Sequence, residues 1–319
     1  METIDEQQRQ LDFWGEGSKL FGIFIVNMLL TLITLGLYYP WARAATMKYL
    51  YQETEFEGSR FTFHGTGKEM FLGFIKALGI FGGLYLILFL FMWVGNPLFT
   101  LLGFLIFFTG ISLLTPIAIH GALRYRMSRT SWRGIHFGYR GNLSELIRIC
   151  IIGFLLTLVT FGIYSFWFEM KVRRYLIQNI RFGNVQFSFR GDGTDWFGLN
   201  LAGYLLTIIT LGIYSFWWMK DRLKFQFSNI RIHQDDSTIK VKTSFTGGNY
   251  FGLVIVNGIL MAITLGLATP WIIIRNIKYI FDNIVLDGAF NPEAIQQTEE
   301  DYRDATGDDL MDALDMGMM

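Results

Sequence analysis

Few residues in this chain have a type and spacing that could support catalysis or metal binding. None of the four histidines (His64, His120, His136 and His233) has the His-x-x-x-His spacing of a helical metal site. His64 and His136 lie in similar predicted hairpins and could share a metal ion, although exposed hairpin histidines are the simpler interpretation. Cys150, the only cysteine, lies inside an apolar run and is expected to pack there. Because neither a phosphate-binding glycine loop nor a nucleophile elbow occurs, the sequence predicts no catalytic residue, no metal, no cofactor and no enzyme.

Cationic residues show a more regular spacing. The sequence Thr-Leu-Gly-Leu-Tyr at 34–38 recurs with small changes at 160–164, 210–214 and 264–268, and a degenerate copy begins at Thr115. A lysine or arginine stands fourteen residues after each of these threonines: Lys48, Arg129, Arg174, Lys224 and Lys278. Lysine and arginine side chains can reach lipid phosphates at a membrane surface. We therefore predict that these five residues bind anionic lipid headgroups.

Tryptophan and glycine recur at fixed distances from the same threonines. The tryptophans stand seven residues later and are expected to form an aromatic belt at headgroup level: Trp41, Trp167, Trp217 and Trp271. The glycines stand two residues later: Gly36, Gly162, Gly212 and Gly266. Glycine inside a helix costs roughly 1 kcal/mol relative to alanine, so it indicates either positive φ or close contact with a neighbouring helix. The flanking threonine and aromatic residues favour the first explanation, a helix break.

Two asparagines occupy apolar segments seven residues before their threonines. Asn27 and Asn257 are expected to lie inside membrane helices. Hydrogen bonding between helices is the simpler interpretation of such residues. The alternative is that they line a polar path through the membrane.

The elements that position these residues are long apolar segments. Hydrophobic residues make up 52% of the 319-residue chain and charged residues only 17%. Six apolar segments lie at about 20–40, 71–93, 98–119, 146–168, 197–218 and 251–274. At 1.5 Å per residue they are long enough to cross roughly 30 Å of hydrocarbon. This pattern excludes a soluble enzyme, and the single cysteine excludes a disulfide-stapled secreted domain.

The recurring unit consists of an apolar helix, a basic amphipathic helix and a short β-hairpin. We predict a mainly α-helical, polytopic membrane protein built from such internal repeats, with about six transmembrane spans. The predicted parts are an acidic N-terminal segment at 1–16, repeat 1 at 17–65, a helical hairpin with a degenerate repeat 2 at 66–141, repeat 3 at 142–191, repeat 4 at 192–247, repeat 5 at 248–290, and an acidic disordered tail at 291–319.

These motifs resemble a known family. The signature Thr-Leu-Gly-Ile-Tyr-Ser-Phe-Trp is intact at 210–217 and altered at 160–167, and Phe-x-Phe-x-Gly closes the hairpins. Together they are similar to the YjgN-like family of multi-pass bacterial inner-membrane proteins, over roughly residues 13–288. The resemblance implies an inner-membrane location. It implies no activity, because the family's domain has no known function.

The basic segments leave the membrane topology open. If each apolar segment crosses once, segments 42–70 and 120–145 share one side and 169–196 lies opposite, yet they hold four, five and five Lys and Arg residues. The positive-inside rule predicts a difference between the two sides. We favour six spans with both termini in the cytoplasm. Alternatively, each Thr-Leu-Gly is a turn, so that the following helix re-enters and hairpins on one face pair with each other.

Charge and composition suggest the class of partner. Without the acidic stretches 1–16 and 292–319 the chain holds 25 basic and 13 acidic residues, a net charge of +12. The basic residues adjoin apolar segments, so anionic membrane lipids are the expected partners and nucleic acid is not. The function predicted is that of a transporter, channel or lipid-handling protein. The alternative is a non-catalytic scaffold or regulatory protein that recruits a cytoplasmic partner through its acidic tail, and a homo-oligomer is compatible with either.

Overall fold

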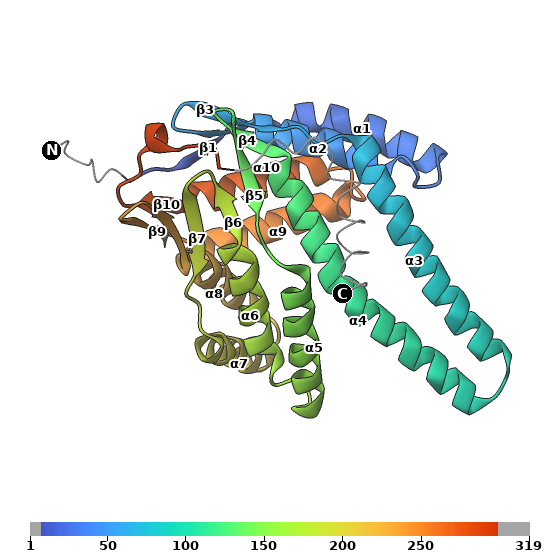
Figure 1. Ribbon diagram of the computed structural model, residues 1–319. Coiled ribbons are helices and arrows are strands. Elements are labelled where there is room, and N and C mark those ends of the chain that lie inside the picture. The colour runs from blue at the N-terminus through green and yellow to red at the C-terminus, as the bar shows by residue number, and fades with distance from the viewer. Residues whose placement is uncertain (1–7, 299–319) are drawn as a thin grey trace.

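The computed structural model describes residues 8–298, and Figure 1 shows their arrangement. The chain is mostly helical, and the order strand–helix–helix–strand occurs five times along it. The first two units are β1 (Leu11–Phe13), α1 (Gly17–Ile33), α2 (Tyr39–Gln52) and β2 (Thr54–Phe56), then β3 (Ser59–Phe63), α3 (Gly67–Trp93), α4 (Pro97–Ser128) and β4 (Thr130–Trp132). The third is β5 (Ile135–Tyr139), α5 (Leu143–Val159), α6 (Ser165–Gln178) and β6 (Ile180–Phe182). The last two are β7 (Val185–Phe189), α7 (Gly193–Ile209), α8 (Ser215–Ser228) and β8 (Ile230–Gln234), then β9 (Ser237–Thr243), α9 (Gly247–Ile263), α10 (Thr269–Asp282) and β10 (Ile284–Asp287).

The ten strands form one antiparallel sheet in which each strand pairs with the next along the chain. The sheet meets itself where Arg9, just before β1, exchanges two backbone hydrogen bonds with Leu286 of β10, at N···O distances of 2.9 and 2.7 Å. Side chains from the strands form one buried cluster with Phe290 and Ile295: Phe56, Trp132, Phe182, Val185 and Ile239. A largely aromatic core therefore fills the middle of the nearly closed sheet.

Both ends of every helix pair are attached to this sheet. The two strands that flank a pair are hydrogen-bonded to each other, with Leu11 of β1 opposite Phe56 of β2 and Thr243 of β9 opposite Ile284 of β10. The first helix of each pair consequently leaves the sheet and the second returns to it. Residues 8–298 do not show six spans with connecting segments on alternating sides. The basic segments meet in one sheet instead, as the re-entrant alternative requires.

The Thr-Leu-Gly motifs form the turns within four of the helix pairs. At the α7–α8 turn, Leu211 has φ of 50° and Gly212 has φ of 96°, so both residues are left-handed. The Thr210 hydroxyl donates to the Leu206 carbonyl (2.7 Å) and accepts from the backbone N–H of Tyr214 (2.9 Å). Gly36, Gly162 and Gly266 also have φ of 92–93°. The apolar segments predicted at 20–40, 146–168, 197–218 and 251–274 are therefore each divided at this turn.

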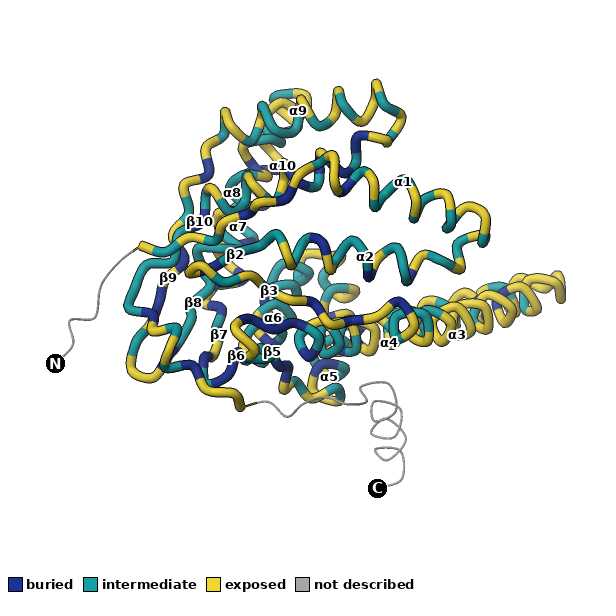
Figure 2. The backbone as a smooth tube through the Cα atoms, turned by 90° about the horizontal axis from the view of Figure 1, so that it is seen from above, coloured by how far each residue is buried: buried dark blue, intermediate teal, exposed yellow. Residues whose placement is uncertain are grey.

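The ten α-helices of residues 8–298 follow one another around a ring. Each helix packs against the next along the chain, and α10 packs against α1. The pair α3 and α4 differs from the other four, because it is much longer and its turn is Val94-Gly95-Asn96. This pair extends far beyond the other helices, and most of its residues are exposed (Figure 2).

Residues 291–298, assigned to the acidic tail from the sequence, belong to the fold. Asn291 exchanges hydrogen bonds with the Gln234 side chain, a 3-10 helix spans Pro292–Ala294, and Ile295 is buried in the sheet core. Thr298 donates to the Gly183 carbonyl at 2.8 Å. The remainder of the tail, 299–319, and residues 1–7 of the acidic N-terminal segment lie outside the described residues.

Candidate functional site

The cations predicted to bind lipid occupy one structural position, with one correction. Four of them lie in the second helix of a unit, five residues before the residue that caps the helix C-terminus: Lys48, Arg174, Lys224 and Lys278. Arg129 does not match, because it is itself the C-terminal cap of α4. Arg124 stands five residues earlier and is the structural counterpart. The helix α4 continues through Thr115 and Pro116 without the usual turn, so a count from Thr115 reaches the wrong arginine.

Arg129 instead joins the two long helices near the sheet. Its guanidinium donates to the Glu69 carboxylate of α3 at 2.8 Å. The same carboxylate accepts from the Tyr125 hydroxyl at 3.0 Å and from the Thr66 backbone N–H at 3.0 Å. Three donors thus converge on Glu69, which indicates a structural role for Arg129.

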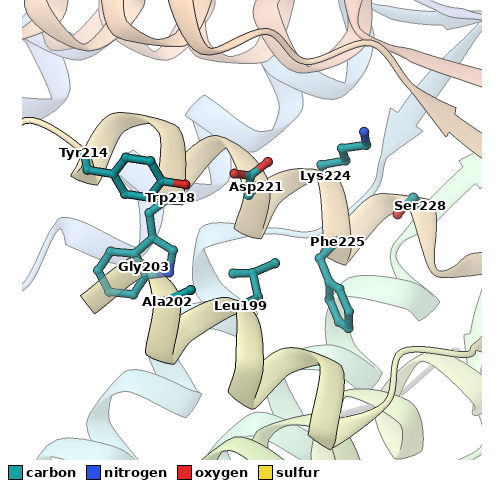
Figure 3. A pocket seen from close by; sticks show the side chains of 9 residues that line it. All are labelled: Leu199, Ala202, Gly203, Tyr214, Trp218, Asp221, Lys224, Phe225 and Ser228. Carbon is teal, nitrogen blue, oxygen red and sulfur yellow. The ribbon is translucent and has the colours of Figure 1, made fainter. Parts of the chain in front are cut away.

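Two of the cations line grooves. The α7–α8 groove has a volume of 370 Å³ and is lined by Leu199, Ala202, Gly203, Tyr214, Trp218, Asp221, Lys224, Phe225 and Ser228. Figure 3 shows Asp221 and Lys224 along α8, with Leu199 and Ala202 across from them on α7. Lys220 forms an ion pair with Asp221, and Arg222 lies 5.5 Å from the centre of the Trp218 ring. The groove therefore combines an apolar floor with charged groups on one helix.

The second groove, the α9–α10 groove, is larger and more apolar. Its volume is 790 Å³, and it is lined by Phe21, Leu260, Ile263, Thr264, Leu265, Leu267, Ala268, Trp271, Ile274, Arg275 and Lys278. Within residues 8–298 no hydrogen bond or ion pair engages the side chain of Arg275 or Lys278. The pKa of the Glu16 carboxyl lies below its usual value because Lys19 donates a hydrogen bond to it, and Lys278 adds to that effect. The groove thus has an apolar wall and two cations, with one acidic residue nearby.

Arg174 and Lys48 occupy the position of Lys224 and Lys278 in two other units, five residues before the C-terminal cap of the second helix. The Arg174 guanidinium donates to the Gly191 carbonyl at 2.9 Å, and the residue is exposed. Lys48 is exposed. Each cation lies in the second helix of its unit, and Arg174 reaches the segment that begins the next unit.

The four predicted belt tryptophans pack between neighbouring units. Each indole covers the first residue of the next unit's first helix, a glycine whose added Cβ would overlap the ring: Trp41 on Gly67, Trp167 on Gly193, Trp217 on Gly247 and Trp271 on Gly17. Each also contacts a phenylalanine one turn further along, with ring centroids 5.0–6.3 Å apart. This role was missed from the sequence, although the glycines at the helix starts were visible there.

The two asparagines predicted to be intramembrane differ from each other. Asn257 of α9 donates to the Asn276 side chain of α10 at 2.8 Å, so it does bond between helices. Asn27 donates to the Ile23 carbonyl of its own helix at 2.7 Å. A polar cluster that the sequence did not indicate lies beside α7, where the Trp196 indole donates to Glu169 at 2.9 Å and Arg173 pairs with the same carboxylate at 3.7 Å.

The histidine pair lies at the sheet, with His136 in β5 and His64 directly after β3. The rings of His64 and His136 have centroids 5.4 Å apart, and His64 Nε2 is 2.8 Å from the Ser131 hydroxyl. Burial lowers the pKa of His64, and positive charge on His136 and Arg129 lowers it further. Among residues 8–298 no group of three or more His, Cys, Asp or Glu side chains could hold a metal ion. Cys150 is half-buried in α5.

Among the described residues, α3 and α4 are the two helices long and apolar enough to cross a membrane. Only 6% of the most apolar 18-residue window of each is buried, so neither is an internal core helix. The helices α1 and α9 are apolar but have 17 residues each.

Comparison with known proteins identifies relatives of this chain. Inner membrane protein YjgN of Salmonella typhimurium (strain LT2) is 29% identical over 171 residues, which are 50% of this chain and 41% of that protein. Inner membrane protein YjgN of Escherichia coli O157:H7 is 33% identical over 136 residues, 43% of this chain and 32% of that protein. The chain thus matches less than half the length of these curated relatives. No solved structure matches it.

A family profile accounts for nearly the whole chain. The profile described as "Bacterial protein of unknown function (DUF898)" matches four successive stretches, 8–147, 138–188, 184–238 and 236–313. Together with the YjgN relatives, this match confirms the resemblance predicted from the Thr-Leu-Gly signatures. The long apolar helices and the relatives' names support a membrane protein. The chain belongs to this bacterial family of unknown function.

Proposed function

We propose that this chain is an integral inner-membrane protein that binds anionic phospholipids in the grooves beside its basic helices, as a lipid-handling protein without enzymatic activity. The α9–α10 groove carries the proposal. One part of its wall is apolar, from Leu260 to Leu267, and Arg275 and Lys278 stand at another part. A phospholipid has the same division between acyl chain and phosphate.

The position of the cations in other units supports the same proposal. Lys224 lines the α7–α8 groove, and Lys48, Arg124 and Arg174 stand at the matching helix position. Five occurrences of one element order and four successive profile matches support an origin by internal duplication. Equivalent cations in duplicated units would give several lipid sites around one ring.

Lipid binding has more support here than a channel function. Phe56, Trp132 and Phe182 are packed in the middle of the sheet, so a polar path would have to avoid this core. A scaffold role through the acidic tail would rest on residues beyond 298.

The test is lipid retention by the purified full-length protein. Each cation near an anionic surface contributes about 1 kcal/mol, so the double variant Arg275→Gln and Lys278→Gln should weaken phosphatidylglycerol binding by about 2 kcal/mol, or about 30-fold. Native mass spectrometry with phosphatidylglycerol and phosphatidylcholine measures both the loss and the selectivity.

The matched control removes two cations from the sheet. Lys240 and Lys242 lie on β9 and line neither groove. Lys240→Gln with Lys242→Gln should leave phosphatidylglycerol binding nearly unchanged. Equal losses in the two double variants would mean that the lipid responds only to total charge, and the groove proposal would be abandoned.

A further inference from the structure

We infer that four helix pairs (α1–α2, α5–α6, α7–α8 and α9–α10) enter and leave a single leaflet of the membrane from the side of the sheet, while α3–α4 alone crosses the bilayer. The sheet then lies in the cytoplasm. This inference concerns how the chain sits in the membrane, and it does not depend on any lipid bound in the grooves.

The connectivity requires that each helix pair starts and ends at the sheet. Because the strands that flank each pair are hydrogen-bonded neighbours, the turn of every pair lies away from the sheet. Figure 1 shows the strands gathered together and the helix pairs projecting from them. A membrane that receives one turn therefore receives the others from the same side.

The four short turns have the surface of a segment embedded in hydrocarbon. The residue before the glycine in each is a large apolar side chain that is 92–98% exposed: Leu35, Phe161, Leu211 and Leu265. A left-handed conformation costs an L-residue roughly 1–2 kcal/mol, so four exposed, strained apolar residues would gain little from a turn in water. Burial in acyl chains accounts for both their type and their exposure.

The backbone of these turns suits a medium without water. In the α1–α2 turn, every N–H from Thr34 to Tyr39 donates a hydrogen bond, five to carbonyls and that of Tyr38 to the Thr34 hydroxyl. Unsatisfied backbone groups cost several kcal/mol each in the bilayer core. A turn whose N–H donors are all used can enter the hydrocarbon without the penalty of unpaired donors.

Helix lengths separate the short pairs from the long one. From Lys224 to the start of α8 at Ser215 the helix rises about 14 Å at 1.5 Å per residue, which is near half of the roughly 30 Å hydrocarbon layer. From Arg124 to the start of α4 at Pro97 the rise is about 40 Å, enough to cross the whole layer. With the cations at one headgroup level, the short turns lie near the bilayer centre and the α3–α4 turn emerges on the far side.

The charges then obey the positive-inside rule. Between residues 71 and 123, Lys76 is the only lysine or arginine, and the four short turns carry none. Apart from Lys76, every lysine and arginine of residues 8–298 therefore lies either beside the sheet, at the sheet end of α3–α4, or in a helix pair that enters the membrane from that side. The rule assigns that side to the cytoplasm and removes the conflict that alternating spans created.

Cysteine accessibility tests this arrangement in the full-length chain. On a Cys150→Ser background, single cysteines are placed by Leu211→Cys, Asn96→Cys and Lys240→Cys, all at exposed positions where the side chain packs little. With a membrane-impermeant maleimide, we expect Asn96→Cys to label from the periplasm and Lys240→Cys from the cytoplasm. Leu211→Cys should label from neither side until detergent is added.

Two results would overturn the inference. Labelling of Leu211→Cys from the periplasm would mean that the α7–α8 pair crosses the membrane, and cytoplasmic labelling of Asn96→Cys would mean that α3–α4 does not. A nitroxide at Leu211→Cys gives an independent measure of depth through its accessibility to oxygen and to a nickel chelate. A position near the bilayer centre supports the inference, whereas one at headgroup depth contradicts it.

Discussion

Packing of tryptophan on glycine between units can be tested at the junction of α8 and α9. Gly247 is the first residue of α9, and an added Cβ would overlap the Trp217 indole. The adjacent Gly248 has no neighbouring atom within 4 Å of the same position. Gly247→Ala and Gly248→Ala therefore make the same chemical change one residue apart. The first adds a methyl group in contact with the Trp217 ring, and the second adds it in open space.

The expected costs follow from this difference. Inserting a methyl group into a packed contact typically costs about 1–3 kcal/mol, so Gly247→Ala should destabilise the protein by that amount. Gly248→Ala should be neutral or stabilising, by up to about 1 kcal/mol of helix propensity. Thermal unfolding in detergent should show Gly247→Ala melting several degrees lower, at roughly 2–4 °C per kcal/mol or somewhat less for a chain of this length.

A double-mutant cycle links the effect to the indole. On a Trp217→Ala background the ring is absent, so adding Gly247→Ala should cost little, which gives a coupling energy of about 1 kcal/mol or more. Equal melting temperatures for Gly247→Ala and Gly248→Ala would refute the packing argument. So would an identical cost of Gly247→Ala with and without Trp217.

Two other predictions concern charged groups on the sheet side. Glu69→Gln should lower the melting temperature, because the Glu69 carboxylate accepts hydrogen bonds from Tyr125 and Arg129. Hydrogen bonds to charged groups contribute about 1.5–3 kcal/mol. The control is Asp195→Asn, at an exposed acid in the first turn of α7, which should change the melting temperature little. The pKa of His64 lies below the ordinary value of about 6.5. The unfolded chain therefore binds the proton more readily, and the protein loses stability as the pH falls from about 7.5 to about 5. His64→Gln should make this loss smaller, and thermal melts of both proteins across this range measure the difference; parallel curves would contradict the lowered pKa of His64.

Local features of the fold could be predicted from the sequence, because they depend on neighbouring residues. The Thr-Leu-Gly turns and the strands around Gly183-Asn184 lie where the glycine and alternation patterns place them. Closure of the sheet could not be predicted, since it depends on Arg9 meeting Leu286 at the other end of the chain. Strands of three to seven residues give no signal that specifies such distant partners.

The cations predicted to bind lipid show a second reason why the sequence-based prediction failed in part. Counting from Thr115 assumes that the degenerate unit keeps the turn of the others, but α4 is one continuous helix, so the count shifts from Arg124 to Arg129. The tryptophans show a third reason. A Trp at a membrane interface and a Trp packed on a helix-start glycine give the same spacing, and a contact such as that of Trp271 with Gly17 joins the two ends of the chain.

The segment 289–298 provides a final prediction, because its composition suggests a dispensable tail and its contacts do not. Phe290 and Ile295 are buried in the sheet core, and burial of each is worth about 1.5–3 kcal/mol. Two chains, one ending at Thr298 and one at Gly288, differ only by this segment. The shorter chain should be less stable by about 3–6 kcal/mol, a large part of the typical total of 5–15 kcal/mol. It should also bind a hydrophobic dye that the longer chain does not, because Phe56 and Trp132 lose their cover. Equal melting temperatures for the two chains would show that the segment does not seal the core, and Ile295→Ala in the longer chain would then also be without effect.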